Sequence, residues 1–332
     1  NLNKAKSIML QDRFGRTIDY LRVSVTDRCD LRCAYCIPKG FRGFQMPQSW
    51  LTIDEITRVV RVFASMGTKR IRLTGGEPLL RKDLTELVQN ISVIDGVEDL
   101  SLSTNATRLA TQAYDLKRAG LDRINVSLDS LRGECVQSIT GNDSLPKVLH
   151  GLRIAKGAGF SQIKLNMVLL QGINEQDVSA MLHYCIDNQF TLRLIETMPM
   201  GGTGLAMGYV SAQPIIDELI AQHQLVPIHK TLGGGPARYW QTADGQTTVG
   251  VITPISQHFC DTCNRVRLSV DGTLYMCLGQ EERFELRPLL RAGCTDNELE
   301  NAIRQAIELK PEKHEFKDKP EKIVRFMSMT GG

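Results

Sequence analysis

An alternation of short apolar runs with amphipathic helical patterns constrains the fold of this chain more than any other sequence feature. The strand-like runs are Leu21–Val25, Arg70–Thr74, Asp99–Ser103, Arg123–Ser127, Ile163–Leu169 and Thr191–Glu196. Between them, apolar residues recur three and four positions apart, as in amphipathic helices. Such a series of β/α units predicts a parallel sheet. A complete eight-unit barrel needs about 250 residues, so six units predict an incomplete (β/α)6 barrel of the TIM type.

Two of the helical patterns carry a start signal. Thr52–Ala64 opens with Thr52 and has Glu55 three residues later, which is the pattern of a capping box. Asp83 and Glu86 repeat this pattern in the segment that ends at Ile91. The other helical patterns of this region are Leu109–Ala119, Pro146–Ala158 and Gln176–Asn188.

The strand-like runs have a polar inner face. In a closed barrel the inward residues are bulky and apolar. Here the alternate residues are Arg22, Ser24, Arg70, Arg72, Thr74, Ser101, Ser103, Arg123, Asn125, Ser127, Asp129, Lys164, Asn166, Thr191 and Arg193. Because unpaired buried charge is costly, they predict a cavity for a large anionic ligand that forms hydrogen bonds. The alternative is a register shifted by one residue, which would turn these groups toward solvent.

Beyond about residue 200 the β/α alternation stops. Predicted features of this part are a loop at Gly201–Gly204, a short helix at Gln213–Gln222, a break at Gly233–Pro236, strands at Gly250–Thr253, Val266–Val270 and Thr273–Cys277, and a hairpin turn at Asp271-Gly272. We therefore predict a partial-barrel core in residues 1–200. A smaller C-terminal α+β unit, residues 201–332, should cover the open side of the barrel.

Composition narrows the function classes. The 332 residues carry a net charge of +3, which does not by itself indicate nucleic acid as a partner. No apolar run reaches about 18 residues and no signal-peptide pattern occurs, so we expect no membrane span and a cytoplasmic location. Nine cysteines then indicate metal binding rather than disulfides. The charged run Lys310–Lys322 predicts a solvated surface segment.

Directly after the first strand-like run, three cysteines lie within eight residues: Cys29, Cys33 and Cys36. The spacing C-x3-C-x2-C can ligate three irons of a four-iron cluster and leave the fourth iron open for chemistry. The alternative is a zinc site or three unrelated core cysteines, although zinc prefers four ligands. After the second run, Gly75-Gly76 allows a sharp turn, from which Glu77 could accept a hydrogen bond from an ammonium group.

A second set of cysteines consists of Cys260, Cys263 and Cys277. It again has no clear fourth ligand, although Cys294 and His258 could complete a zinc site. Arg265 and Arg267 lie between these thiols and would share one face of a strand. Since guanidinium groups bind phosphate oxygens bidentately, this pair favours a phosphate-bearing substrate.

The first cysteine set and the Gly75–Pro78 turn together resemble the radical S-adenosylmethionine (SAM) enzymes. In that family the open iron binds SAM, and one-electron reduction yields a 5′-deoxyadenosyl radical. From about Phe14 to Gly332 the chain is also similar to the GTP 3′,8-cyclase family (molybdenum cofactor biosynthesis protein A). The matching stretches are Asp19–Cys29, Arg70–Leu79, Arg123–Asp129, Phe259–Ser269 and Gly331-Gly332.

This resemblance implies roles for the matching residues. Two 4Fe–4S clusters would be ligated, the first by Cys29, Cys33 and Cys36 and the second by Cys260, Cys263 and Cys277. The implied contacts with SAM are Tyr35, Gly76, Glu77, Ser127 and Met198. The implied contacts with GTP are Arg22, Arg72, Ser103, Lys164, Arg265 and Arg267. The implied catalytic residues are Arg265, Arg267, Gly331 and Gly332, the last two forming a tail that enters the active site.

The implied reaction begins with removal of the ribose 3′ hydrogen of GTP by that radical and ends at 3′,8-cyclo-7,8-dihydro-GTP, the first step of molybdenum cofactor biosynthesis. The resemblance also implies an external electron donor, a homodimer, and transfer of the product to cyclic pyranopterin monophosphate synthase. Asp30 and Ala106 depart from the usual asparagine and glycine. Cys135, Cys185 and Cys294 match no motif and are predicted to be buried thiols, and Arg193 and Asn166 share the predicted lumen.

Two other functions stay open. One is a radical SAM peptide maturase, a class whose C-terminal extensions usually contain more cysteines. The other is a non-enzymatic iron–sulfur or zinc module that binds RNA through Arg and Lys. Such a module predicts exposed aromatic residues for base stacking, yet aromatic residues make up only 6% of the chain.

Overall fold

The structure, a computed structural model, describes residues 9–38, 40–229, 232–316 and 325–331. A single sheet of twelve strands runs through the described part of the chain. The strands are β1 (Tyr20–Ser24), β2 (Arg70–Thr74), β3 (Asp99–Thr104), β4 (Arg123–Ser127), β5 (Ile163–Leu169), β6 (Thr191–Glu196), β7 (Val226–Ile228), β8 (Arg238–Gln241), β9 (Thr248–Ile252), β10 (Arg265–Leu268), β11 (Thr273–Tyr275) and β12 (Arg283–Glu285).

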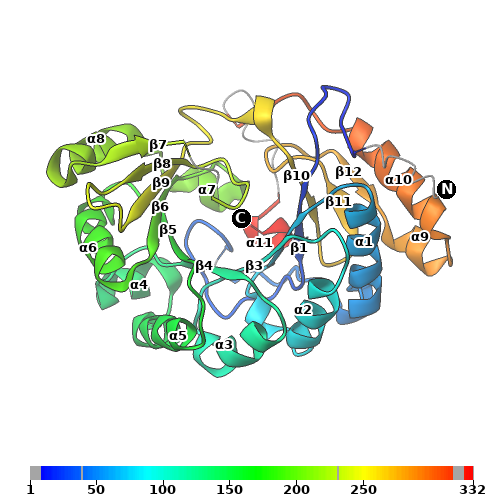
Figure 1. Ribbon diagram of the computed structural model, residues 1–332, viewed down its shortest axis with the longest axis horizontal. Coiled ribbons are helices and arrows are strands. Elements are labelled where there is room, and N and C mark those ends of the chain that lie inside the picture. Colours follow the sequence, from blue (N-terminus) through cyan, green and yellow to red (C-terminus); the bar gives the residue numbers. More distant parts are fainter. Residues whose placement is uncertain (1–8, 39, 230–231, 317–324, 332) are drawn as a thin grey trace.

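Eleven helices accompany this sheet in the described residues. They are α1 (Ile53–Ser65), α2 (Leu84–Ser92), α3 (Leu109–Arg118), α4 (Gly133–Thr140), α5 (Leu145–Gly157), α6 (Val178–Asn188), α7 (Gly201–Ala206), α8 (Ala212–His223), α9 (Arg287–Arg291), α10 (Asp296–Glu308) and α11 (Met327–Thr330). In Figure 1, α1 to α6 lie around the outside of the curved sheet, whereas the short α11 near the C-terminus lies on its inner side.

The strand order confirms the incomplete barrel. It runs β12-β11-β10-β1-β2-β3-β4-β5-β6-β9-β8-β7, and β1 to β6 are parallel. The sheet is not closed, because β12 and β7 form its two edges. Strands from beyond residue 200 extend it at both sides, with β10 parallel to β1 and β9 parallel to β6. The division of the chain at residue 200 stays a prediction.

The pairing register confirms the polar inner face. Arg22 pairs with Arg72 and with Arg267, and Arg72 pairs in turn with Ser101. The alternate residues of these strands, such as Leu21 and Leu73, lie in the hydrophobic core beneath the helices. The alternative register is therefore wrong, since it would exchange the two faces.

Of the two predicted capping boxes, one is confirmed and the other is wrong. Thr52 and Glu55 form the predicted capping box at α1. Asp83 makes no side-chain cap at α2; its carboxylate accepts a hydrogen bond from Arg81 Nε at 2.6 Å instead. The predicted loop Gly201–Gly204 is also wrong, because it begins the helix α7.

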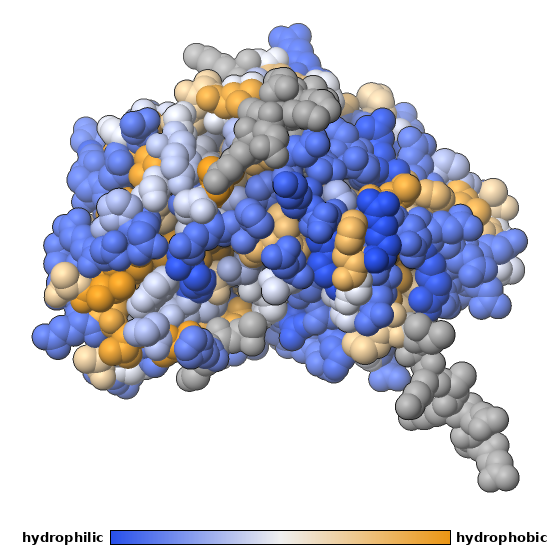
Figure 2. All heavy atoms as spheres, turned by 90° about the horizontal axis from the view of Figure 1, so that it is seen from above, coloured by the Kyte–Doolittle hydropathy of each residue, from blue (hydrophilic) through white to orange (hydrophobic). Residues whose placement is uncertain are grey.

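The predicted hairpin and the buried thiols are confirmed. Gly272 adopts a φ of +83° between the antiparallel β10 and β11. Cys135, Cys185 and Cys294 are buried. Among the described residues no helix is both long and apolar enough to cross a membrane. Figure 2 shows one face of the molecule on which hydrophilic residues predominate and hydrophobic residues form scattered patches.

Candidate active site

The first set of cysteines lines a cavity on the inner side of the sheet. This first cavity contains about 1020 Å³ of space, part of it open to solvent. Its walls include Cys29, Cys33, Cys36, Tyr35, Thr74, Gly75, Gly76, Ser103, Asn105, Ser127, Asn166, Ile195 and Met198. The sheet thus brings four of the five predicted SAM contacts, all except Glu77, beside the three thiols.

The glycine turn after β2 positions the cysteine loop. Gly76 N donates to Thr26 O at 2.9 Å, and Glu77 N donates to Arg28 O at 2.7 Å. A Cβ atom on Gly75 would lie 2.2 Å from Thr26 O, and one on Gly76 would lie 2.2 Å from Arg28 O. The two backbones can approach this closely only because both residues are glycine. The turn therefore fixes the segment that leads directly into the cysteine loop.

Glu77 accepts hydrogen bonds from the protein itself, whereas the sequence predicted that it could accept one from an ammonium group. Its carboxylate is fully buried and accepts from Thr104 Oγ1 at 2.6 Å, Asn105 N at 2.7 Å and Leu79 N at 3.0 Å. Burial raises the pKa of Glu77 to about 7, despite these hydrogen bonds. The carboxylate joins the turn after β2 to the end of β3, and it does not line the first cavity.

The surroundings of the first cysteine set disfavour free thiolates. Burial raises the pKa of Cys29 and of Cys36 to about 12, and the pKa of Cys33 rises well above its usual value for the same reason. The carboxylates of Glu77 and Asp129 add to this effect. Since a coordinating thiol is deprotonated outright by a metal, these thiols are expected to ionise only with iron bound.

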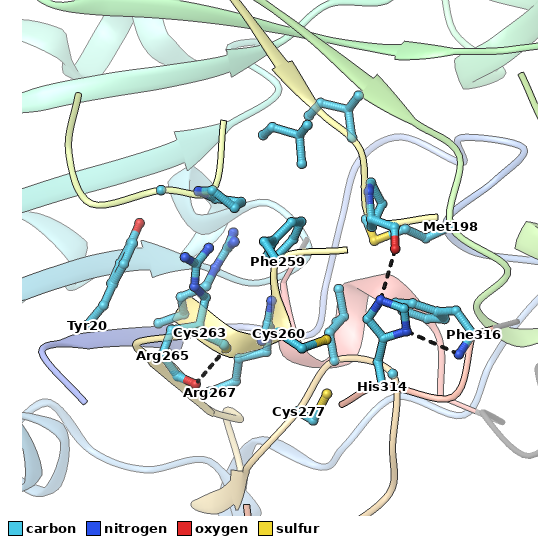
Figure 3. A pocket seen from close by; sticks show the side chains of 18 of the residues that line it. Tyr20, Met198, Phe259, Cys260, Cys263, Arg265, Arg267, Cys277, His314 and Phe316 are labelled. Atoms are coloured by element: carbon cyan, nitrogen blue, oxygen red, sulfur yellow. Dashed lines mark hydrogen bonds between the residues drawn. The ribbon is translucent and has the colours of Figure 1, made fainter. Parts of the chain in front are cut away.

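The second set of cysteines lines an adjoining second cavity of about 930 Å³ (Figure 3). The side chains that surround it include Cys260, Cys263, Cys277, Tyr20, Arg22, Arg72, Asn166, Arg193, Ile195, Met198, Phe259, Arg265, Arg267, His314 and Phe316. Figure 3 shows Phe259, Arg265 and Arg267 beside the three cysteines in the wall of this cavity. Asn166, Ile195 and Met198 line both cavities, so the two cavities are neighbours.

Buried cations make the second cavity electropositive. Burial would raise the pKa of Cys263, but the charges of Lys310 and Arg265 outweigh this effect and lower it to about 7. In contrast, burial raises the pKa of Cys260 and of Cys277. Lys310 is itself only 1% exposed, so the predicted solvated segment is wrong at its first residue. Residues 317–322 of that segment lie outside the described part of the chain.

Several guanidinium nitrogens in the second cavity have no hydrogen-bond partner, although they are buried. They are Nε and Nη2 of Arg22, Nε of Arg265 and Nε of Arg267. Burial lowers the pKa of Arg72 and Arg267 to about 10, and it lowers the pKa of Arg22 well below the usual value. Unpaired buried donors are costly, so they fit a bound anion with several oxygen acceptors.

The remaining predicted site residues lie in different places. Lys164 is buried and donates to Leu232 O at 2.7 Å, and burial together with Arg193 lowers its pKa to about 6. Arg193 donates to Asn166 Oδ1 at 2.8 Å, so both belong to the lumen. Ser103, a predicted GTP contact, lines the first cavity rather than the second.

The C-terminal tail packs against the end of β2 beside the first cavity, which Thr74 and Met327 line. Gly331 has a φ of +69°, and a Cβ atom there would lie 2.3 Å from Thr74 Cγ2 at the end of β2. Only glycine fits this approach without strain. Gly332 lies outside the described residues.

Sequence reasoning missed four residues near the cysteines. Tyr20 lines the second cavity and its buried hydroxyl has no partner. Asn105 Nδ2 lies 3.8 Å from Cys29 Sγ and donates to Asp30 Oδ1 at 2.8 Å. His314 lines the second cavity, and Lys310 donates to Cys263 Sγ. Alternation with Arg22 along β1 is a signal that could have placed Tyr20 on the inner face, but no sequence signal marked the other three.

A zinc site would need four ligands that converge on one ion. Among residues 9–316 and 325–331, with the gaps given above, no three His, Cys, Asp or Glu side chains lie where they could hold one metal ion. Cluster ligands differ from zinc ligands, because each thiolate binds its own iron and the sulfur atoms need not converge on one ion.

Comparisons with known proteins agree with this geometry. A family model of the radical SAM superfamily matches residues 23–185, and one described as Molybdenum Cofactor Synthesis C matches residues 190–316. The chain is 43% identical over 330 residues to a GTP 3′,8-cyclase of Marinobacter nauticus, covering 97% of this chain and 98% of the relative. The chain belongs to the GTP 3′,8-cyclase family. A relative of the same name from Pelotomaculum thermopropionicum is also 43% identical, over 97% of this chain and all of its own.

Solved structures support the fold. The crystal structure of Streptococcus suis SuiB bound to S-adenosylmethionine has a TM-score of 0.62 with this chain, at 13% identity. The match covers 89% of this chain and 72% of SuiB. At that identity the likeness shows the incomplete-barrel fold alone.

Proposed function

We infer that this chain is a radical SAM lyase that converts GTP to 3′,8-cyclo-7,8-dihydro-GTP in molybdenum cofactor biosynthesis. The observation that carries this inference is the juxtaposition of two cavities, each with three cysteines, around one polar lumen. Relatives named GTP 3′,8-cyclase at 43% identity favour this function over the peptide maturase. The buried location of the arginines argues against the RNA-binding module, which would need exposed cations.

The residues present fit the implied cofactors. We propose that Cys29, Cys33 and Cys36 hold one 4Fe–4S cluster and that Cys260, Cys263 and Cys277 hold another. SAM bound at the first cluster supplies, on one-electron reduction, the radical that removes the ribose 3′ hydrogen of GTP.

The chain's own residues would bind and orient both ligands. We propose that Tyr35, Gly76, Ser127 and Met198 contact SAM, because they line the first cavity beside the thiols. Tyr35 Oη donates to Asp129 Oδ2 at 2.7 Å, which fixes the ring in place. Glu77 would act indirectly, through the turn that it stabilises.

We propose that the buried arginines bind the triphosphate and orient the nucleotide between the two clusters. Arg22, Arg265 and Arg267 have unpaired N–H groups that can donate hydrogen bonds to phosphate oxygens. Lys164 and Arg72 would add charge on the same inner face, whereas Ser103 would reach the substrate from the first cavity. Holding the ribose and the base in one orientation supplies the positioning that ring closure needs. Gly331 would close the site beside Thr74, and we propose a catalytic role for the Gly331-Gly332 pair.

Anaerobic reconstitution with iron and sulfide, followed by incubation with SAM, a reductant and GTP, tests this function. We expect 5′-deoxyadenosine and the cyclised nucleotide with GTP, and neither product when ATP replaces GTP. Formation of 5′-deoxyadenosine at the same rate without GTP would contradict the proposal.

Three further features belong to the proposal. The enzyme would act as a cytoplasmic homodimer, take its electron from an external donor, and transfer its product to cyclic pyranopterin monophosphate synthase. Sedimentation of the reconstituted protein tests the dimer. A coupled assay with the synthase tests the identity of the product. The synthase should form cyclic pyranopterin monophosphate only when the cyclised nucleotide is present.

A further inference from the structure

Lys310 is a fully buried cation beside the second set of cysteines. It follows α10 and is among the largest side chains with less than 2% exposure. Its Nζ donates to Met276 O at 2.7 Å, to Arg265 O at 3.0 Å and to Cys263 Sγ at 3.4 Å. An ammonium group has three protons, so each has an acceptor.

The acceptors belong to both segments that carry the second set. Arg265 is the first residue of β10 and Cys263 lies two residues before it, whereas Met276 directly precedes Cys277. One ammonium group therefore joins the backbone on either side of the β10–β11 hairpin at the point where its thiols project. Lys310 approaches from α10, so it fixes this pair of strands from outside the hairpin.

The charge of Lys310 has no carboxylate partner among the ion pairs of the described residues. A buried cation without a counter-charge is costly, whereas a thiolate ligand offers one. Arg265 and Arg267 add further positive charge on the cavity side. The position is thus suited to an anionic group, such as a cluster with three thiolate ligands.

Two other buried cations hold the neighbouring segments. Arg16 Nη1 donates to Cys260 O at 2.8 Å, and Arg325 Nη2 donates to Cys277 O at 3.3 Å. Both contact backbone carbonyl groups, whereas Lys310 also contacts a ligand sulfur atom. Lys310 is therefore the residue of these three that can act on the cluster itself.

We propose that Lys310 is a positioning residue of the second cluster. Its ammonium group holds Cys263 and the strand of Cys277 in place for cluster assembly, and its N–H···S hydrogen bond raises the reduction potential of that cluster. A positive charge and a hydrogen bond to a ligand sulfur both stabilise the reduced state, which carries one more electron. This inference rests on the proposed function in one respect, namely that the second set binds a cluster.

Four full-length proteins test the inference: the unmodified chain, Lys310→Met, Lys310→Gln and the control Lys313→Met, whose side chain is exposed on the same segment. Each is reconstituted anaerobically. To isolate the signal of the second cluster, each is also made with Cys29, Cys33 and Cys36 replaced by alanine. A redox titration followed by electron paramagnetic resonance gives the midpoint potential, and a chelator challenge gives the rate of iron loss.

We expect Lys310→Met to lower the midpoint potential and to lose iron about 10- to 100-fold faster, as is typical when an outer-shell partner is removed. Lys310→Gln keeps a donor without the charge and should show a smaller decrease of the potential. If Lys310→Met does not fold, as judged by circular dichroism, the potential and iron-loss rate of Lys310→Gln alone test the inference. An unchanged potential and an unchanged iron-loss rate in both variants, or equal changes in Lys313→Met, would overturn the inference. If instead the unmodified chain binds iron only at the first set, the proposed function fails as well.

Discussion

The two cysteine sets present three thiols each, but their surroundings carry opposite charge. Cys29, Cys33 and Cys36 lie in one short loop whose charged neighbours are mainly carboxylates, those of Glu77, Asp30 and Asp129, with the cation Arg32 beside Cys29. Cys260, Cys263 and Cys277 come from two segments near Lys310, Arg265 and Arg267. The first loop is fixed by close backbone contact with a glycine turn, whereas buried cations fix the second set.

This difference matches two different tasks. Negative surroundings disfavour an added electron and lower the potential of a cluster, as a strong one-electron reductant requires. Positive surroundings raise the potential and attract an anionic substrate. We therefore expect the cluster of the second set to have the higher potential. The predictions below test this division, beginning with the largest expected effect.

Replacing one cysteine of each set should show that the first set is needed for SAM binding and the second set is not. We expect Cys33→Ser and Cys263→Ser each to reduce formation of the cyclised nucleotide by at least about 100-fold, since loss of an outer-shell partner alone costs about 10- to 100-fold. Equilibrium dialysis with labelled SAM should detect binding in Cys263→Ser but not in Cys33→Ser. Equal loss of SAM binding in both variants would show that the sets are not functionally separate.

Removing a guanidinium from the second cavity should weaken GTP binding alone. A hydrogen bond to a charged group contributes about 1.5–3 kcal/mol, so Arg267→Met should raise the Kd for GTP about 10- to 150-fold. Isothermal titration calorimetry measures this change. The exposed Arg118, which pairs with Asp115 on α3, provides a matched control as Arg118→Met. A Kd unchanged by Arg267→Met would remove Arg267 from the substrate site.

The glycine turn should be needed by the first set only. In Gly75→Ala the new Cβ would meet Thr26 O at 2.2 Å, at a φ of +142°, so we expect a loss of about 1–3 kcal/mol in the free energy of unfolding. The iron content of the reconstituted variant should fall to about that of one cluster, the cluster of the second set. Gly133→Ala is the control, because a Cβ there meets nothing within 4 Å. Loss of iron from the second set would contradict the prediction.

The smallest predicted effect is a pH dependence of GTP binding. Burial lowers the pKa of Lys164 to about 6, so this amine is mostly neutral above that pH in the free enzyme. A bound triphosphate would raise the pKa again, and binding should therefore take up about one proton near pH 7.5. The affinity should accordingly fall as the pH rises above 6. Calorimetry in buffers of different ionisation enthalpy measures the uptake, which should vanish in Lys164→Met.

Sequence reasoning predicted the periodic parts of the molecule well. Hydrophobic alternation predicted the six parallel strands and the inner face of each, and hence the inward Arg22, Arg72 and Arg193. It failed where a residue acts through tertiary contacts. Lys310 stands in a charged run typical of a surface, and only the packing of α10 brings it to Cys263. Asp83 has the composition of a cap, but the nearby Arg81 binds its carboxylate.

The polar residues around the cysteines were harder still. Asn105 and Tyr20 belong to no metal-ligand spacing, and their roles follow from which strands are neighbours. Gly75 and Gly76 predicted a sharp turn, but the sequence did not show that this turn packs against the backbone at Thr26 and Arg28. A local pattern can therefore indicate a close approach without identifying the partner.

Iron analysis of two triple variants tests the central claim most directly. In one, Cys29, Cys33 and Cys36 are replaced by alanine; in the other, Cys260, Cys263 and Cys277 are replaced. After reconstitution each should hold about four irons and no zinc, as expected for one 4Fe–4S cluster. Only the variant without the second set should lose affinity for GTP. Zinc in the first variant, or GTP binding that is unaffected by loss of the second set, would contradict the account.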